Sequence, residues 1–396
     1  MKVLHVIPTI VAADGGPSQM VLGVCRALRR SGLAEAEIAT TIPRRDAIGQ
    51  PGRPAGPQSS DPEVPVWEFP RSFSEAWKYS APLGAWLRAH ARQYDLIHAH
   101  AVFTYSTLAA RVAALRADRP LVITPHGMLS PWCLARKRGR KFCYWHLVEK
   151  HNVRTASSLH ATTPGEQAEL RRLLPGARIE WINLGLDPVA WESPREPNAF
   201  RRRYNIPEDR PLVLFLGRLH SVKGLADMLL PALVSVGEAH LAVVGGVGPN
   251  EPRYANLARA KAARLGLSSR VTFTGAIYGD GRWSAYDDAD VFVVPSSHEN
   301  FGITVIEAMA RGTPCLVTDA VKSSIFVEQV GAGTVVARQV GQMSGALRAL
   351  LALPPSEREA MGRRGREFVR RELTWAHTAQ GMARLYRDIC ANRLKH

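Results

Sequence analysis

The sequence contains no apolar run of 18 or more residues and no Cys-x-x-Cys pair. The first absence argues against a transmembrane helix. The second, together with five scattered cysteines, argues against a disulfide framework or a zinc site. The N-terminus also lacks the apolar core and cleavage site of a signal peptide, and its Val3–Ile7 run predicts a strand instead. We therefore expect a cytoplasmic protein.

Acidic residues are scarce relative to basic ones. The chain of 396 residues has 51 Lys and Arg against 35 Asp and Glu, a formal charge of +16. This balance favours contact with nucleotide phosphates, anionic lipid headgroups or nucleic acid, without choosing among them. The apolar fraction of 46% is ordinary for a soluble enzyme, and the length suggests two domains.

Short β-branched runs alternate with helical patterns along the chain, which predicts α/β domains with parallel sheets. We expect two doubly wound, Rossmann-like domains: residues 1–190, then residues 191–372 after a polar linker, with a final helix at 373–396 packing back toward the first domain. Two such domains imply a central cleft at the carboxyl ends of the strands. The segment 43–65 has six prolines and three glycines and predicts a loop.

The strands of the first domain are expected at 3–7, 37–41, 64–69, 96–99, 121–124, 158–161 and 179–182. Those of the second domain are expected at 212–216, 241–244, 271–274, 291–294 and 315–318. Helices should fill the intervals, among them one from Pro17 to about Arg30 and one from Trp375 to Arg393.

The window from Val291 to Glu307 is the most informative. An apolar strand ends at Val294, a polar loop follows, and a helix begins near Gly302. Backbone N–H groups at such a helix start make a site for a diphosphate. Glu299 in the loop and Glu307 about one turn into the helix could then contact a hexose and a ribose. The alternative is that both glutamates only cap or solvate a surface helix.

A second strand-to-helix passage runs from Leu212 to Gly224. Gly217 allows close backbone approach at the strand end, and Arg218 and Lys223 follow it. Two cations there could neutralise a leaving diphosphate. The alternative is a pair of solvated surface cations.

Paired glycines, Gly15 and Gly16, follow the first strand and precede a helix, so a phosphate or sugar could lie against the backbone. The full Gly-x-Gly-x-x-Gly pattern is absent, which disfavours a dinucleotide site. His98 and His100 invite a metal interpretation, but no carboxylate or cysteine stands at ligand spacing, and we interpret them as structural or cleft-wall residues. We expect no metal and no cofactor.

The segment from Trp132 to Arg154 carries seven basic residues against one acid, Glu149. The basic residues are Arg136, Lys137, Arg138, Arg140, Lys141, Lys150 and Arg154, interleaved with Trp132, Phe142, Tyr144 and Trp145. Basic and aromatic side chains together suit an anionic membrane surface or single-stranded nucleic acid. The alternative is a solvated helix whose aromatic residues face the core.

Three elements make the chain resemble the GT-B retaining glycosyltransferases of family 4. They are the Gly15-Gly16 loop, the Gly217-Arg218 to Lys223-Gly224 segment and the Glu-x7-Glu pattern from Glu299 to Glu307. Supporting pieces are Asp95–His100, Pro125–Met128 and Asn183–Asp187, so the resemblance spans nearly the whole chain.

The resemblance implies a role for each matching residue. Arg218 and Lys223 would hold the donor diphosphate, Glu299 the donor sugar and Glu307 the ribose. His126 would lie in the cleft near the transferred sugar. We expect the donor site to include the backbone of Gly15, Gly16, Gly217, Asn300, Phe301, Gly302, Ile303 and Thr304, with Arg218, Lys223, Glu299 and His126 acting on the reacting groups.

These observations predict a retaining transfer of a hexose from a UDP- or GDP-sugar to a glycan acceptor. The expected acceptor is lipid-linked, as in cell-surface polysaccharide assembly, with the enzyme peripheral on the inner membrane face. Two alternatives stay open at this point. One is another GT-B enzyme such as a nucleotide-sugar epimerase. The other is a basic nucleic-acid-binding protein, in which Arg218, Lys223, Glu299 and Glu307 have no role.

Overall fold

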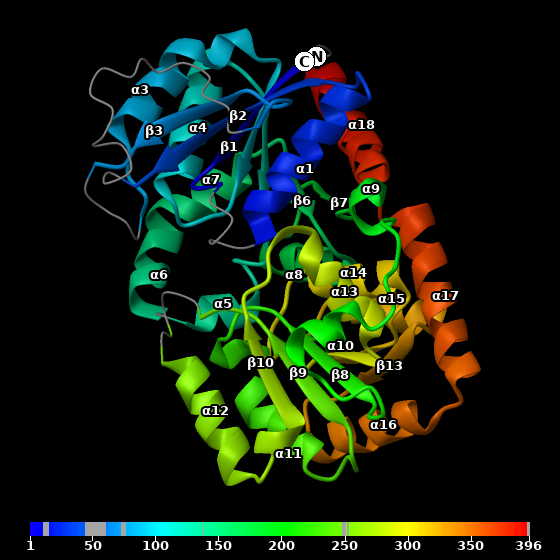
Figure 1. Ribbon diagram of the computed structural model, residues 1–396. Coiled ribbons are helices and arrows are strands. Elements are labelled where there is room, and N and C mark those ends of the chain that lie inside the picture. The colour runs from blue at the N-terminus through cyan, green and yellow to red at the C-terminus, as the bar shows by residue number, and fades with distance from the viewer. Residues whose placement is uncertain are drawn as a thin grey trace. The chain divides into compact units, whose positions relative to one another are not determined.

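The computed structural model describes residues 1–10, 16–43, 61–72, 77–136, 138–247, 251 and 253–393. Gly15, Lys137 and most of the expected loop at 43–65 lie outside these ranges. The chain divides into two compact units (Figure 1). Unit 1 comprises Met1–Gly185 and Trp375–His396, and unit 2 comprises Leu186–Thr374.

Unit 1 is built on a seven-stranded sheet in which every pairing is parallel. Its spatial order is β3 (Val66–Pro70), β2 (Glu35–Ile42), β1 (Lys2–Ile7), β4 (Leu96–His100), β5 (Leu121–Thr124), β6 (Ser158–Ala161) and β7 (Ile179–Trp181). The central strands β1 and β4 are buried almost throughout, as expected of a parallel sheet with helices on both sides. All seven strands lie where the sequence predicts them, with small shifts at the ends.

The helices of unit 1 are α1 (Gly16–Arg30), α3 (Ala81–His90), α4 (Tyr105–Ala117), α5 (Pro131–Ala135), α6 (Arg138–Tyr144), α7 (Lys150–Arg154), α8 (Pro164–Leu173) and α18 (Trp375–Arg393). A π-helical turn, Trp145–Glu149, joins α6 to α7. The last helix, α18, lies along α1 although the two are far apart in sequence (Figure 1). Gly23 allows this approach, since a Cβ at Gly23 would lie 2.4 Å from the Trp375 ring. Among the described helices, none is both long enough and apolar enough to cross a membrane.

Unit 2 is built on a six-stranded sheet, again parallel throughout. Its order is β10 (Val271–Gly275), β9 (His240–Val244), β8 (Leu212–Leu216), β11 (Val291–Val294), β12 (Cys315–Thr318) and β13 (Gly333–Val336). The edge strand β13 is a correction, because the sequence analysis placed no strand there. Its β-branched run, Thr334 to Val336, is short and follows Gly331 and Gly333, so it falls below the length of about four to eight residues that is typical of a strand signal.

The helices of unit 2 are α9 (Pro188–Trp191), α10 (Ala199–Tyr204), α11 (Leu230–Leu233), α12 (Tyr254–Arg264), α13 (Trp283–Asp288), α14 (Ile303–Arg311), α15 (Ser324–Val330), α16 (Val340–Ala352) and α17 (Pro355–Glu372). Short turns at Ser221–Lys223 and Leu225–Leu229 precede α11. Both units are doubly wound α/β domains, as the sequence predicts.

Each sheet reverses its winding direction at one place. In unit 1 the chain moves outward from β1 to β2 and β3, then returns to add β4 on the other side of β1. In unit 2 the same reversal lies between the adjacent strands β8 and β11. Ligands of doubly wound sheets bind outside the carboxyl ends of the strands at such a reversal. The β1/β4 and β8/β11 ends are therefore the places to look for a site.

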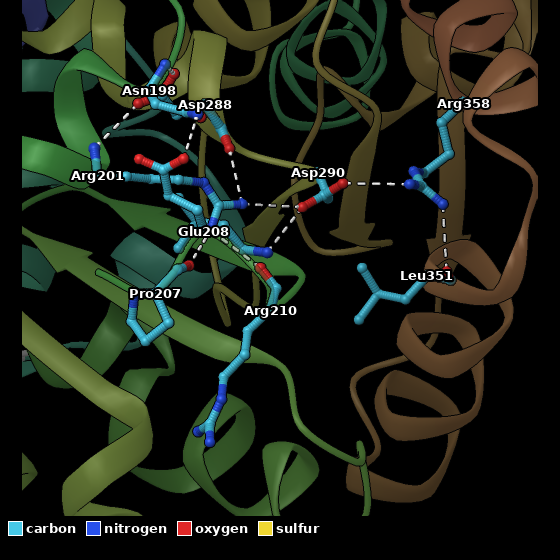
Figure 2. Close-up of polar contacts among 10 residues, drawn as sticks. Asn198, Arg201, Pro207, Glu208, Arg210, Asp288, Asp290, Leu351 and Arg358 are labelled. Atoms are coloured by element: carbon cyan, nitrogen blue, oxygen red, sulfur yellow. Dashed lines mark hydrogen bonds and ion pairs between the residues drawn. The ribbon is translucent and has the colours of Figure 1, made fainter. Parts of the chain in front are cut away.

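The polar linker expected between the domains is tied into unit 2 by charges (Figure 2). Arg201 of α10 is buried and donates to the Asp290 carboxylate at 3.3 Å, and Arg358 of α17 donates to the same carboxylate at 3.2 Å. Asp290 also accepts from the backbone N–H of Leu212, where β8 begins, at 2.8 Å. One carboxylate thus joins the linker, the first strand of the sheet and α17.

We predict that Asp290→Ala lowers the free energy of unfolding by about 2–3 kcal/mol. The change leaves a buried guanidinium without its carboxylate partner and a strand N–H without an acceptor. Chemical denaturation measures the loss. Asp209→Ala removes an exposed carboxylate nearby and should change the stability by less than about 0.5 kcal/mol. An equal effect of the two substitutions would contradict the structural role of Asp290.

Candidate functional site

The β8/β11 reversal of unit 2 brings together two residues that the sequence analysis singled out. Lys223 ends the turn after β8, and Glu299 lies in the loop between β11 and α14. Their side chains form an ion pair although 76 residues separate them. Both side chains are partly buried, so the pair is shielded from bulk water but accessible to a ligand.

Backbone contacts hold the two loops together. Gly224 has φ 75°, and a Cβ there would lie 2.0 Å from the Pro295 carbonyl oxygen. The N–H of Ser297 donates to the Val222 carbonyl at 2.8 Å. Only glycine permits this approach, so Gly224 places Lys223 beside Glu299.

The N-terminus of α14 begins next to this pair. Gly302 precedes the helix with φ 71°, and a Cβ there would lie 3.3 Å from the Glu299 side chain. Ile303 and Thr304 form the first turn and are partly exposed. The first N–H groups of a helix have no partner within it and carry a partial positive charge. The helix thus starts where the sequence predicts it, and the binding of an anion there stays a prediction.

The loop before α14 is held from the other side. Phe301 is buried, and Asn300 accepts from Lys322 Nζ at 3.2 Å. The backbone of Glu299 bonds to Ala320 and Lys322 at 3.2 and 3.1 Å. The sequence analysis did not identify Lys322 as part of this region, because its loop follows β12 and carries no motif of its own.

Arg218 follows directly after β8 and is exposed. Its side chain makes no hydrogen bond or ion pair with the described residues, so the guanidinium is available to an anion. The close approach of backbone to backbone here requires a glycine at Gly245, since a Cβ there would lie 1.8 Å from the Gly217 carbonyl oxygen. A Cβ on Gly217 itself would meet only Lys223 Cε, at 4.0 Å.

Glu307 lies in the second turn of α14 and is buried. Its carboxylate accepts from Arg282 Nε at 3.1 Å and from the Tyr286 hydroxyl at 2.8 Å. Burial and the neighbouring Glu307 raise the pKa of Tyr286 well above its ordinary value, so the phenol stays a donor. The ribose contact of Glu307 stays a prediction. Neither Arg282 nor Tyr286 carries a sequence signal that points to this bond.

In unit 1, Gly16 begins α1, and Gly15 lies outside the described residues. His126 follows β5 in a left-handed conformation, φ 54°, and is partly exposed. Its Nε2 lies 3.2 Å from His100 Nδ1. Burial lowers the pKa of His126 to about 4, so the imidazole is neutral near pH 7.

His126 belongs to a cluster of five histidines that the sequence analysis did not find as a whole: His5, His98, His100, His126 and His160. The sequence did carry a signal for this cluster, because the strands β1, β4 and β6 each contain a buried histidine. The histidines of β1 and β4 are paired in register, His5 with His98. One ring nitrogen from each of His5, His98 and His100 lies within 4.8 Å of the others, as in a candidate metal site. However, both nitrogens of His98 are bonded, to Tyr386 and Thr124 at 2.7 Å each. A metal would have to break one of these bonds.

Comparison with known proteins identifies the chain. Residues 197–368 match the model of the family described as glycosyl transferases group 1, and residues 15–185 match a glycosyl transferase 4-like domain. A D-inositol 3-phosphate glycosyltransferase of Xylanimonas cellulosilytica is 31% identical, over 96% of this chain and 93% of its own length.

Solved structures show the same architecture. Sucrose-phosphate synthase of Thermosynechococcus elongatus superposes with a TM-score of 0.82 at 25% identity, covering 99% of this chain and 100% of that one. Anabaena HepE, solved in complex with UDP and glucose, superposes with a TM-score of 0.76 at 20% identity, covering 98% and 100%.

The fold and the family models together define a glycosyltransferase of the GT-B class. The chain belongs to the group 1 glycosyltransferases of family 4. Membership of this family favours the transferase over the nucleic-acid-binding protein, the alternative left open by the sequence.

We predict that Glu299→Ala lowers turnover by roughly two orders of magnitude or more, while the melting temperature changes by only a few degrees. The carboxylate lies in a loop and contributes to one partly exposed ion pair, which adds little to stability. Glu328→Ala removes an exposed carboxylate of the same unit and serves as the control. Parent-like turnover of Glu299→Ala with the true acceptor would show that Glu299 is not part of the site.

Proposed function

We propose that the enzyme transfers a hexose, with retention of anomeric configuration, from a UDP- or GDP-sugar to a hydroxyl acceptor. One observation carries the proposal: within unit 2, the Lys223–Glu299 pair lies at the β8/β11 reversal with the start of α14 and with Arg218, which has no partner among the described residues. Cations and a helix start suit a diphosphate, and a carboxylate beside them suits a sugar hydroxyl. HepE, which shares the fold, was solved with UDP-glucose.

The proposed step breaks the bond between the anomeric carbon and the diphosphate oxygen. The acceptor hydroxyl forms the new bond on the same face, and its proton goes to the departing phosphate. Arg218 and Lys223 neutralise the charge that develops on the leaving diphosphate, which is the demanding part of the reaction. Glu299 positions a sugar hydroxyl while remaining paired to Lys223. No covalent glycosyl-enzyme is involved in this proposal.

The proposed reaction uses no divalent metal and no cofactor. Two basic side chains and the helix dipole supply the positive charge that a metal would otherwise bring to the diphosphate. His126 contributes a neutral hydrogen bond to the transferred sugar. Within unit 2, the proposed donor site includes the backbone of Gly217, Asn300, Phe301, Gly302, Ile303 and Thr304, with the ribose on Glu307.

We predict that Arg218→Ala and Lys223→Ala each weaken the binding of the free nucleoside diphosphate by about 10- to 150-fold. A charge-assisted contact to phosphate contributes about 1.5–3 kcal/mol. Titration calorimetry with UDP and GDP measures the effect, and binding to the parent should be unchanged by EDTA. Arg348→Ala, an exposed cation on α16, is the control. Native affinity in both variants, or binding that requires Mg²⁺ or Mn²⁺, would contradict the proposed site.

The segment Trp132–Arg154 supports a lipid-linked acceptor and an enzyme peripheral on the inner face of the membrane. Phe142 and Leu147 are 65% and 80% exposed. Trp145 packs against the unit 1 core and Tyr144 accepts from Trp77 Nε1 at 3.1 Å, so the core-packing alternative holds for these two aromatic residues. The apolar side chains left at the surface are those suited to a bilayer interface.

The one acidic residue of this segment does not oppose its positive charge at the surface. Glu149 is fully buried and accepts from the Phe103 N–H at 2.8 Å. Burial raises the pKa of Glu149 to about 7, so a large share of this carboxyl is neutral near pH 7. The surface charge of the segment is therefore basic, as attraction to anionic lipid requires.

We predict that the double substitution Phe142→Ser and Leu147→Ser reduces binding to phosphatidylglycerol-containing vesicles by at least about tenfold. Full burial of each apolar side chain in the bilayer interface contributes about 1.5–3 kcal/mol of binding free energy. Val189→Ser, at an equally exposed valine of unit 2, is the matched control. Cosedimentation at low and high salt measures binding, and nucleotide affinity should not change. No binding of the parent to anionic vesicles would contradict membrane docking.

A second candidate acceptor is a small phosphorylated polyol. The names of two similar proteins, D-inositol 3-phosphate glycosyltransferase and sucrose-phosphate synthase, favour it. The basic segment that suits lipid headgroups also suits a phosphate monoester. An acceptor panel that couples nucleotide release to either lipid-linked glycans or sugar phosphates separates the two.

A further inference from the structure

The five histidines of unit 1 form two separate hydrogen-bonded strings. The first contains His98 and His160, and the second contains His5, His100 and His126. Burial lowers the pKa of every member, to about 3 for His5 and about 4 for His126. A neutral imidazole has one N–H donor and one bare nitrogen acceptor. Each string therefore has a direction along which its protons point.

The backbone fixes the direction of the first string. His160 Nε2 lies 2.8 Å from the Ile182 carbonyl, which only accepts, so the proton of His160 is on Nε2. His160 Nδ1 then accepts from Thr124 Oγ1 at 2.8 Å, and Thr124 accepts from His98 Nε2 at 2.7 Å. The Tyr386 hydroxyl of α18 donates to His98 Nδ1 at 2.7 Å. Every member of this string is satisfied.

The second string runs from a buried end to a partly exposed one. His5 Nδ1 lies 3.0 Å from His100 Nε2, and His100 Nδ1 lies 3.2 Å from His126 Nε2. The ring centroids are 5.2 and 5.4 Å apart, with interplanar angles of 15° and 20°. An N···N bond of about 3 Å between two coplanar five-membered rings gives about this spacing. The three rings are therefore joined end to end.

An unpaired atom gives the second string its direction. His5 Nε2 is buried and has no hydrogen-bond partner among the described residues. If the protons pointed toward His5, this nitrogen would carry a buried N–H with no acceptor. If they point away, it is only a bare acceptor, and orphaned buried N–H groups are the rarer and less favourable of the two. The protons therefore point from His5 to His100 to His126.

We propose that His5 and His100 are positioning residues that hold His126 as a neutral imidazole with its proton on Nδ1, a fixed hydrogen-bond donor to an oxygen of a bound sugar. His126 Nε2 is occupied as an acceptor by His100. Its Nδ1 has no hydrogen bond with the described residues. The proposal rests on the proposed function only for the identity of that oxygen.

The same string disfavours a proton on both nitrogens of His126. A second proton would make Nε2 a donor toward His100, reverse the whole string and place an orphan N–H on His5. Two other ionisable groups act on His126: Glu166, which favours the charged ring, and His160, which opposes it. Reversal of the hydrogen-bond string is unfavourable and opposes the effect of Glu166 on the charged ring. His126 therefore stays a neutral hydrogen-bond donor through neutral pH.

The test is ¹⁵N NMR of the histidine rings in the full chain at pH 7.5. We expect His126 to show a protonated Nδ1 and a bare Nε2. His100→Asn keeps an N–H donor where Nδ1 lies and should keep this pattern, whereas His100→Leu removes the donor and should lose it. Tyr386→Phe breaks one bond of the other string and is the matched control, with the His126 signals unchanged. A protonated Nε2 on His126 in the parent would overturn the proposal.

Kinetics test the positioning role separately. His100→Leu should lower kcat at least about tenfold, with the KM for the donor changed less than about twofold, and His100→Asn should restore most of the loss. If His100→Leu loses the NMR pattern but keeps its kcat, the positioning role is wrong, although the tautomer assignment stands. If the proposed donor chemistry is wrong, Arg218→Ala and Lys223→Ala will instead bind the nucleotide as tightly as the parent does. The NMR pattern of His126 will then still be intact.

Discussion

A contact between two backbone segments, rather than any pair of charges, determines where the chemistry of unit 2 lies. Gly224 rests against the Pro295 carbonyl at a distance that excludes every side chain. Because of this contact, the turn after β8 and the loop after β11 form one surface. Lys223 and Glu299 are neighbours only as a consequence. The ion pair is partly exposed and contributes little to stability, so the glycine is the element on which the site depends.

The topology of the sheet makes this contact possible. In both units the chain reverses between two adjacent strands, which leaves their carboxyl ends without a crossover above them. In unit 2, charged side chains and the start of a helix lie at these strand ends. In unit 1 the corresponding strands β1 and β4 carry histidines, and burial keeps these neutral. One architecture therefore carries partly exposed charges in unit 2 and buried neutral histidines in unit 1.

Much of the fold could be predicted from the sequence because buried parallel strands are continuous apolar runs, and most strands lie where such a run occurs. The edge strand β13 could not, since its β-branched run is short and lies in a glycine-containing segment. The polar linker gave no hint of the Asp290 network, because ion pairs between residues far apart in sequence leave no local pattern. The same limit applies to the site. Arg218, Lys223 and Glu299 could be selected by motif, but the bonds of Glu307 to Arg282 and Tyr286 could not.

Charged side chains in unit 2 and neutral histidines in unit 1 suit the two charge changes of the proposed glycosyl transfer. The leaving diphosphate gains negative charge as its bond to the anomeric carbon breaks, whereas the sugar ring gains positive charge. In the proposed reaction, Arg218 and Lys223 stabilise the first change. A cation beside the ring would oppose the second change, whereas a neutral imidazole can donate a hydrogen bond to a sugar hydroxyl without adding charge. Burial among other neutral histidines keeps His126 in that neutral form, which suits the role proposed for it.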